Sequence, residues 1–300
     1  MNFFNAIVIG FVQGVGEFLP ISSSGHLVLL YQLFNITGDT VLISIFLHIA
    51  TLFSVLYVYR KQLIELIKHP FCKTNKLLIY ATIPTVILAI LFKGLITSSF
   101  ENNFVIFGFL ITAVVLGIAD YLTENTQLVT LTNISNNNNS MLIKSLPNTY
   151  SLNNSNDIVC SKSKLLQEKN DITNINLSLK QVLIMGIAQG IACFPGISRS
   201  GSTIATGLIL KGDKEEVTTF SFLLSIPIII GSLVFSFIDL QPSAIKISTF
   251  SLITSCLISF LVGIVSISLI NSVVKKQKLS YFSFYLIGLV FLVLLIKFIF

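Results

Sequence analysis

Two stretches of this sequence carry acidic, basic and hydroxyl side chains of the kinds that handle phosphate, and they are copies of one pattern. Residues 9–26 read IGFVQGVGEFLPISSSGH, and residues 185–202 read MGIAQGIACFPGISRSGS. The copies differ at three telling positions: Glu17 faces Cys193, Ser23 faces Arg199, and His26 faces Ser202. One copy therefore brings a carboxylate and an imidazole, and the other brings a guanidinium. Such internal repeats in an apolar chain predict a membrane fold with one site near the repeat interface.

The first candidate group is an acid with an amide beside it. Gln13 and Glu17 are four residues apart, so a helix presents both on one face. A carboxylate buried at membrane depth is costly and is a functional residue by default. The alternative is a hydrated acid near the interface, or one bonded to hydroxyls of the next turn. We favour a functional role because Glu17 lies among other polar groups at depth.

The second candidate group is the serine run that follows Pro20. Pro20 ends the first helix, and Ser22 is the predicted N-cap of a return helix that contains Ser23, Ser24 and His26. A helix start offers free N–H groups and a positive dipole end, which suit an anion such as phosphate. His26 is a candidate proton donor, nucleophile or metal ligand. A serine cap that only satisfies backbone donors is the alternative, and the nearby Glu17 and His26 weaken it.

The third candidate group is the matching loop of the second copy, residues 195–203. Arg199 stands there at another helix start, and its hydroxyl neighbours are Ser198, Ser200 and Thr203. A guanidinium fork binds two phosphate oxygens at once, which a lysine does less well. The alternative is a structural partner for Glu17. Both roles are compatible, because an empty site allows the acid and the arginine to pair.

Other reactive residues give weaker signals. His48 lies in an apolar span without polar company in the sequence, and we interpret it as structural or at most supporting. The four cysteines form no CxxC pair and no metal-ligand spacing, so we expect neither a disulfide framework nor a zinc site.

The composition indicates the elements that must position these groups. With 53% hydrophobic and 11% charged residues and a mean hydropathy of +0.87, the chain is an all-helical integral membrane protein. The net charge of +6 is no sign of nucleic-acid binding, because the basic residues lie between apolar spans. We expect transmembrane helices over residues 41–59, 77–97, 104–121, 217–238, 247–270 and 281–300. Residues 1–34 and 179–210 have half-length apolar runs around a polar turn, which is typical of re-entrant hairpins.

The spans divide the chain into two repeats, residues 1–121 and 179–300. Each repeat has one hairpin and three crossings, and an odd number of crossings predicts opposite orientations, which is the inverted-repeat plan. Residues 122–178 between the repeats are rich in Asn, Ser, Thr and Lys, and we expect a mostly disordered linker. Basic residues gather in 60–76 and 271–280, so these loops and the linker are predicted to be cytoplasmic. Both termini and the mouth of the first hairpin then face outward.

The two polar loops resemble those of the undecaprenyl-diphosphate phosphatase family, which is also known for bacitracin resistance. The first signature, an acid or Gln, three residues, Glu and then P-[VI]-S-S-[ST]-G-H, is matched by residues 13–17 and 20–26. The second, P-G-x-S-R-S-G-x-T, is matched by residues 195–203, and F-S-F-L-L at 220–224 is also similar. The likeness covers the chain apart from 122–178. Gln13 and Thr219 stand where many members have glutamates.

The resemblance implies hydrolysis of undecaprenyl diphosphate to undecaprenyl phosphate and inorganic phosphate. This reaction takes place at the outer face of the bacterial cytoplasmic membrane and recycles the lipid carrier of peptidoglycan synthesis. The resemblance also implies a divalent cation, Mg²⁺ or Ca²⁺, and a homodimer. With Glu17 as the expected metal ligand and Gln13 as its only companion, we expect the cation to bridge Glu17 and the diphosphate.

By position, the resemblance assigns functional roles to Gln13, Glu17, Ser23, His26, Ser198, Arg199 and Thr203. The nucleophile is open between Ser23, His26 and water, with Ser23 preferred and with His26 or Glu17 taking its proton. Arg199 and the two helix starts, with Ser22, Ser24 and Ser200, are expected to offset charge on the phosphate oxygens. The second hypothesis is an inverted-repeat transporter of phosphate or of a lipid or organic anion. A transporter needs the anion clamp but no nucleophile and base.

Overall fold

The computed structural model of the protein describes residues 2–36, 40–101, 104–136, 172–238, 248–276 and 278–299, and every regular element in these ranges is a helix. Six of the helices are long and apolar enough to cross a membrane, as predicted. They are α3 (Thr40–Val58), α5 (Lys73–Leu91), α7 (Phe104–Asn136), α11 (Lys214–Ile238), α12 (Thr249–Lys275) and α13 (Ser280–Ile299). The chain is therefore an all-helical, multi-pass integral membrane protein.

Two helical hairpins lie among the long helices. The first is α1 (Phe3–Phe18) followed by α2 (Ser23–Leu33), and the second is α9 (Leu179–Ile191) followed by α10 (Arg199–Ile209). These helices have 16, 11, 13 and 11 residues, fewer than the roughly 20 that a crossing requires. The first turn contains Pro20, and the second contains Gly196 with a φ of +85°, which favours glycine. The predicted helix–turn–helix shape of both segments is confirmed.

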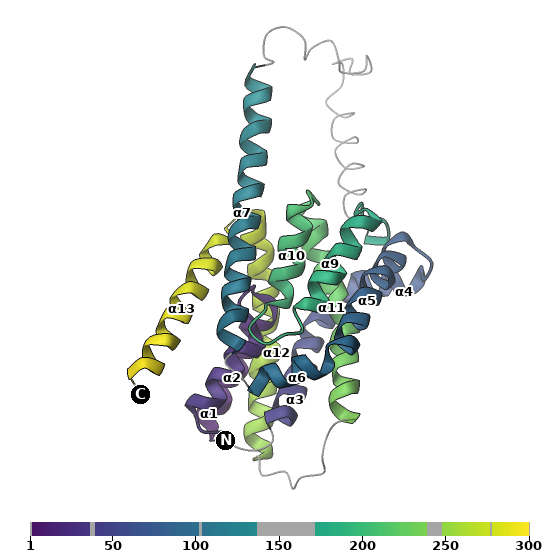
Figure 1. Cartoon of the computed structure of the whole chain (residues 1–300). Helices are drawn as coiled ribbons and strands as arrows, with labels where there is room; N and C mark the ends of the chain where they lie inside the picture. The colour runs from purple at the N-terminus through teal and green to yellow at the C-terminus, as the bar shows by residue number, and fades with distance from the viewer. Residues whose placement is uncertain are drawn as a thin grey trace.

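The hairpins pack against helices from the other half of the chain. Helix α1 packs along α12, and α9 packs along α5; in the repeat alignment α9 is the counterpart of α1, and α5 of α12. Helices α7 and α13, which are also counterparts, pack against each other. Figure 1 shows α1 and α2 in the lower half of the molecule and α9 and α10 in the upper half. The first helix of each hairpin thus packs against a long helix of the opposite repeat, which agrees with two internal repeats. That the two repeats have inverted orientations stays a prediction.

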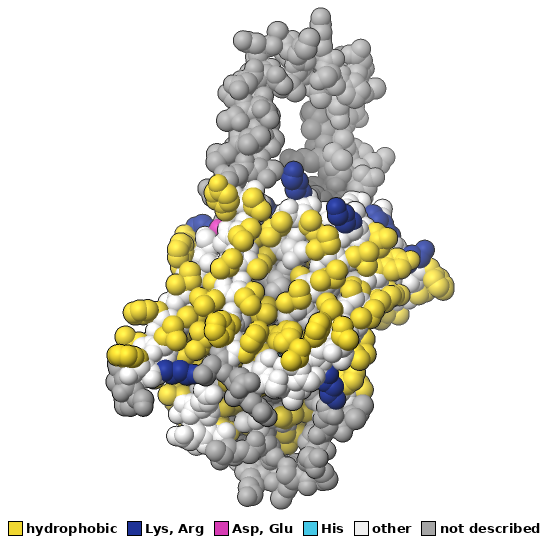
Figure 2. Space-filling model, viewed as in Figure 1, with side chains coloured by type: hydrophobic (Ala, Val, Ile, Leu, Met, Phe, Trp, Pro, Cys, Tyr) yellow, Lys and Arg dark blue, Asp and Glu magenta, His cyan; other side chains and the backbone are white. Residues whose placement is uncertain are grey.

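The outer surface matches a lipid environment. Figure 2 shows hydrophobic side chains spread over the visible face of the helical body, with most of the visible Lys and Arg along its upper rim. That rim is the end from which α7 projects upward in Figure 1. The exposed hydrophobic residues include Phe107 and Val114 of α7, Phe250 and Leu261 of α12, and Phe291 of α13. Apolar side chains at these positions are stable only against lipid or another apolar surface.

Small residues allow the hairpins to approach their partner helices closely. A Cβ atom added to Gly10 of α1 would collide with the backbone of Ser255, and one added to Gly14 would lie 2.7 Å from the Ser259 carbonyl oxygen. In the second half, a Cβ on Gly186 of α9 would collide with the backbone of α5 in the same way. Small residues at membrane helix interfaces allow this backbone approach and the van der Waals contact that holds such helices together.

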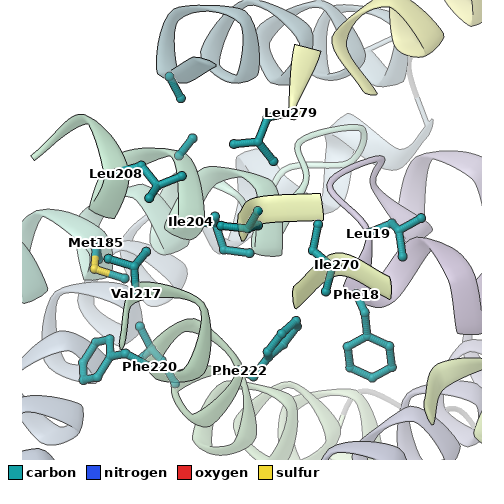
Figure 3. Close-up of a cluster of buried hydrophobic side chains, with 14 of the residues drawn as sticks. Phe18, Leu19, Met185, Ile204, Leu208, Val217, Phe220, Phe222, Ile270 and Leu279 are labelled. Atoms are coloured by element: carbon teal, nitrogen blue, oxygen red, sulfur yellow. The ribbon is translucent and has the colours of Figure 1, made fainter. Parts of the chain in front are cut away.

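The main hydrophobic cluster lies beside the hairpin turns. Figure 3 shows Phe18 and Leu19 from the end of α1 together with Ile204 of α10 and Phe222 of α11. Phe18 is 1% exposed and contacts Phe222 edge to face, with 5.9 Å between the ring centroids. Because Phe18 follows Glu17 directly, this packing fixes the end of α1 where the acid lies.

Three element predictions differ from the structure. The span expected over 77–97 ends at Leu91, and α6 (Lys93–Glu101) follows after a break at Phe92. The loop 60–76 contains α4 (Arg60–Lys68), whose apolar residues recur at helical spacing and bury Leu66. Helix α7 continues to Asn136, so residues 122–136 are helical where we predicted disordered linker.

The extension of α7 has a simple cause, since residues 122–136 contain neither proline nor glycine to end the helix. The end of the predicted linker is ordered too. A 3₁₀ turn, η1 (Ile172–Asn174), precedes Ile175 and Leu177, which are 3% and 2% exposed. The remainder of that prediction, residues 137–171, lies outside the described residues.

The close approach of α1 to α12 predicts a position-dependent effect of adding one methyl group. We expect Gly10→Ala to lower the free energy of unfolding by about 1–3 kcal/mol, because α1 must move away from the Ser255 backbone. The matched control is Gly231→Ala in α11, where an added Cβ meets nothing within 4 Å. Thermal denaturation in detergent measures both variants. Equal changes in melting temperature for the two variants, relative to the wild type, would contradict the close contact of α1 with α12.

Candidate functional site

The turns of the two hairpins lie against each other. The hydroxyl of Ser200, at the start of α10, donates to the carbonyl oxygen of Leu19 at 3.3 Å. A Cβ added to Gly201 would lie 3.0 Å from Cβ of Pro20, so the two turns are in van der Waals contact. The structure thus brings together the two polar loops that are far apart in the sequence.

Glu17 is the centre of this cluster. Its Oε1 atom lies 3.2 Å from Nη2 of Arg199. Its Oε2 atom accepts a hydrogen bond from the hydroxyl of Ser23 at 2.8 Å and another from Nε2 of Gln13 at 3.1 Å. The side chain of Glu17 is only 4% exposed. A carboxylate this deeply buried is stable because it has a positive partner and two hydrogen-bond donors.

Arg199 keeps binding capacity beyond this pair. Its Nη1 atom is buried and has no hydrogen-bond partner within the described part of the chain. A guanidinium with an unused donor beside a pocket can bind an oxyanion without first giving up its carboxylate.

The serines cap the two helices at the site. Ser22 has a φ of +67°, which is uncommon for a residue with a side chain, and its hydroxyl accepts from the N–H of Gly25 at 3.4 Å. Ser198 caps α10 by accepting from the N–H of Gly201 at 3.1 Å. The first residues of these helices, Ser23 and Arg199, both contact Glu17, so the positive end of each helix lies beside the acid. The N-cap predicted at Ser22 is confirmed.

The other hydroxyls of the site bond mainly to each other and to the backbone. The Ser24 hydroxyl lies 3.3 Å from that of Ser22, and the Ser200 hydroxyl lies 3.4 Å from that of Ser198. Thr203 donates to the Arg199 carbonyl oxygen at 3.0 Å, and its hydroxyl also pairs with Ser221. Thr203 thus supports the first turn of α10.

Two hollows flank the ion pair. One is lined by Glu17, Ser22, Ser23, Ser24, His48 and Arg199, with Gly16, Ala192 and Ile197. The other is lined by Glu17, Gln189, Arg199, Thr203, Ser221 and Ser225, with Phe18, Ser200 and Phe222. The first hollow joins the serine run, the acid and the arginine, and is the better place for a phosphate group.

His26 is held away from the acid. Its Nδ1 donates to the carbonyl oxygen of Ser22 at 2.8 Å, which leaves Nε2 to accept from the hydroxyl of Tyr285 at 2.8 Å. Its ring also stacks on that of Tyr285 and lies edge to face with Phe109. The spacing suggested an imidazole close to Glu17 and Ser23. The buried ring instead packs against Phe109 and Tyr285, with its Nδ1 bonded to the carbonyl oxygen one helical turn earlier.

His48 is the residue that the sequence interpretation undervalued. Its Nε2 lies 3.6 Å from Oε2 of Glu17, its Nδ1 donates to the Ser44 carbonyl oxygen at 2.7 Å, and it lines the first hollow. Only the crossing of α3 and α1 brings it there. One signal was present in the sequence: Ser44, His48 and Thr51 recur at helical spacing and form a polar stripe on an otherwise apolar helix.

A divalent cation would find few protein ligands here. Among the described residues, no three His, Cys, Asp or Glu side chains come close enough to form a metal cage. Glu17 is the one carboxylate in the hollow, and Gln13 presents an amide whose buried Oε1 has no partner within the described chain. This donor set fits a cation that completes its coordination with oxygens of a bound anion.

Comparison with known proteins covers nearly the whole chain. The family model described as "Bacitracin resistance protein BacA" matches residues 6–292. Undecaprenyl-diphosphatase 3 of Bacillus cereus is 34% identical over an alignment of 300 positions, which covers 99% of this chain and 98% of that protein. The undecaprenyl-diphosphatases of Alkaliphilus metalliredigens and Carboxydothermus hydrogenoformans are 34% and 30% identical, and cover 95% and 98% of both chains.

The Glu17–Arg199 contact predicts energetic coupling between the hairpins. We expect Glu17→Gln and Arg199→Gln each to destabilise the fold, because each leaves the other charge in the buried site without its partner. The double variant should lose less than the sum, with a coupling free energy of about 1–3 kcal/mol. A double-mutant cycle from thermal or denaturant unfolding in detergent measures this quantity. Additive losses would show that the two charges do not interact in the folded protein.

Proposed function

The chain belongs to the bacitracin resistance protein BacA family, and we propose that it is a membrane phosphatase that hydrolyses undecaprenyl diphosphate to undecaprenyl phosphate and inorganic phosphate. Relatives named undecaprenyl-diphosphatase align with it over nearly its full length, which supports an enzyme over a transporter. The observation that carries the proposal is the hydrogen bond from Ser23 to Glu17 beside Arg199, because transport alone needs no activated hydroxyl.

The terminal phosphate of the substrate would bind in the hollow lined by Ser22, Ser23, Ser24 and Arg199. The free Nη1 donor of Arg199 and the positive ends of α2 and α10 supply the attraction for its oxygens. The same groups would hold the extra negative charge that builds up on the equatorial oxygens during transfer. The polyprenyl tail would remain in lipid, so only the headgroup enters the protein.

Ser23 is the nucleophile in this proposal, and Glu17 is its base. The hydroxyl proton moves to Oε2 of Glu17 while Oγ of Ser23 forms a bond to the terminal phosphorus. The bond from that phosphorus to the bridging oxygen breaks, and undecaprenyl phosphate leaves with the electron pair. Water then attacks the phosphorus of the phosphoserine, and the bond from phosphorus to Oγ of Ser23 breaks. Glu17 returns its proton to Oγ, and inorganic phosphate leaves with the protons of the water. The 2.8 Å hydrogen bond supports this pairing of roles.

His26 receives a positioning role in this scheme. Both of its ring nitrogens are occupied by Ser22 and Tyr285, so it holds the start of α2 against α13. Activated water remains the second candidate nucleophile, since Glu17 is placed to deprotonate it as well. Formation of a phosphoenzyme on Ser23 distinguishes the two.

The proposed enzyme uses a divalent cation, Mg²⁺ or Ca²⁺ by family resemblance. When bound, such an ion would act as a Lewis acid on the phosphate oxygens. Glu17 would hold it together with the substrate, and Gln13 would be a second ligand through its amide oxygen, which has no partner among the described residues.

We also propose that the site faces the outer side of the cytoplasmic membrane. Basic residues cluster in the loops 60–76 and 271–280, which supports a cytoplasmic position for these loops and for the linker. The first hairpin begins at the other end of the molecule, where the N-terminus lies in Figure 1.

Phosphate release from a short-chain polyprenyl diphosphate tests the activity. We expect the purified protein to release inorganic phosphate, and EDTA to stop the release. Glu17→Ala and Arg199→Ala should each lower the rate by about 10²–10⁴-fold, because one removes the base and the other the charge stabilisation. Glu65→Ala and Arg60→Ala, whose side chains lie outside the cluster, are the matched controls. Folded wild-type protein that releases no phosphate would favour the transporter.

Two neighbouring serines distinguish the nucleophile from a binding hydroxyl. Ser23→Ala should reduce the rate by at least about 10³-fold and abolish a trapped phosphoenzyme, since it removes the attacking oxygen. Ser24→Ala, which removes a hydroxyl from the same hollow, should reduce the rate by about tenfold or less. Rapid-quench trapping with substrate labelled on its terminal phosphate measures the phosphoenzyme. A Ser23→Ala loss no larger than that of Ser24→Ala would assign the attack to water.

A further inference from the structure

We propose that His48 is a metal ligand, and that together with Glu17 it gives this chain a mixed nitrogen and oxygen cation site that favours Mn²⁺ over Ca²⁺. This inference deepens the proposed function, because it names a ligand for the cation which that function uses. It rests on the arrangement of His48, Glu17 and Ser23 around one hollow.

The hydrogen bond of the His48 Nδ1 atom determines whether the Nε2 atom of the same ring can bind a metal ion. A carbonyl oxygen only accepts, so Nδ1 of His48 carries a hydrogen in its 2.7 Å bond to Ser44. In the neutral ring the lone pair is then on Nε2, which lies toward the carboxylate. Histidines that bind metals usually have this arrangement, with the remote N–H donated to a backbone carbonyl or a carboxylate that fixes the ring.

The separation of Nε2 from Glu17 suits two ligands of one ion. Oε2 of Glu17 lies 3.6 Å away, which is too long for a direct hydrogen bond. Two atoms bound to one ion at about 2.1 Å, at octahedral or tetrahedral angles, lie about 3.0–3.4 Å apart. A shift of a few tenths of an ångström therefore brings both atoms into one coordination shell. The Ser23 hydroxyl, 2.8 Å from the same Oε2, is a third candidate donor.

The positive charge of Arg199 lies at the other oxygen of the carboxylate. Arg199 pairs with Oε1, while His48 lies toward Oε2, which also accepts hydrogen bonds from Ser23 and Gln13. Oxygens of a bound diphosphate would complete the shell and would bind Arg199 as well. An imidazole nitrogen binds Mn²⁺, a transition-metal ion, more readily than it binds Ca²⁺ or Mg²⁺, which prefer oxygen donors alone.

Pulsed electron paramagnetic resonance of bound Mn²⁺ tests the ligand directly. The full chain in detergent, freed of metal with a chelator, is loaded with Mn²⁺ and methylenediphosphonate, a diphosphate that cannot be hydrolysed at its bridge. We expect nitrogen modulation from one directly bound imidazole, changed in protein labelled with ¹⁵N-histidine. The modulation should vanish in His48→Gln and persist in His69→Gln, whose imidazole lies at the surface beside Glu65. Wild-type protein that binds Mn²⁺ without nitrogen coupling overturns the proposal, whether or not any variant folds.

Affinity gives a second readout. His48→Gln should weaken Mn²⁺ binding at least 10-fold and Ca²⁺ binding less than about threefold, measured by isothermal titration with the diphosphonate present. Equal losses for the two ions, or no Mn²⁺ binding by folded wild-type protein, also overturn it. Neither measurement requires turnover. Phosphate release without nitrogen coupling therefore refutes the ligand alone, and nitrogen coupling without phosphate release refutes the phosphatase alone.

Discussion

The contact between Glu17 and Arg199 is the constraint on which the rest of the site depends. Neither charge is stable alone at this depth, because removing an ion from water costs several kcal/mol even after the protein relaxes. Helix α1 carries the acid and α10 carries the guanidinium, so satisfying the two charges also joins the two hairpins. The hydrogen bonds from Ser23 and Gln13 complete the environment of the carboxylate. The contact that neutralises the two buried charges is therefore also the contact that assembles the site.

The hairpin helices are too short to hold this geometry without support. Their position comes from helices of the opposite half, through backbone approaches at Gly10 on α12 and at Gly186 on α5. Packing of Phe18 on Phe222 then fixes the turn from the side of α11. The first helix of each hairpin therefore packs mainly against a long helix that its own repeat does not supply. Because this packing fixes the helix ends, the polar groups at the turns can remain beside open hollows.

The sequence predicted the parts of the molecule whose causes are local. Hydropathy identified the six long helices, and Pro20 and Ser22 marked the first turn and the cap of its return helix where the structure has them. The repeated pattern also indicated that Glu17 and Arg199 belong to one site. The orientation of single side chains was not predictable, since it depends on contacts between helices. His26 turned to Tyr285 on a helix 259 residues away, and His48 reached Glu17 only because α3 crosses α1.

Divergence within the repeat explains how a near-symmetric scaffold holds an asymmetric site. Gln13 and Gln189 are counterparts, yet Gln13 bonds to Glu17 while Gln189 lies 3.5 Å from the Thr85 hydroxyl. The counterpart of the acid is Cys193, a free thiol. A second carboxylate at that position would place two negative charges against a single guanidinium, and their repulsion would raise the cost of burying either one. With one acid from the first copy and one cation from the second, the charges balance, and Arg199 retains the unused donor that an incoming phosphate requires.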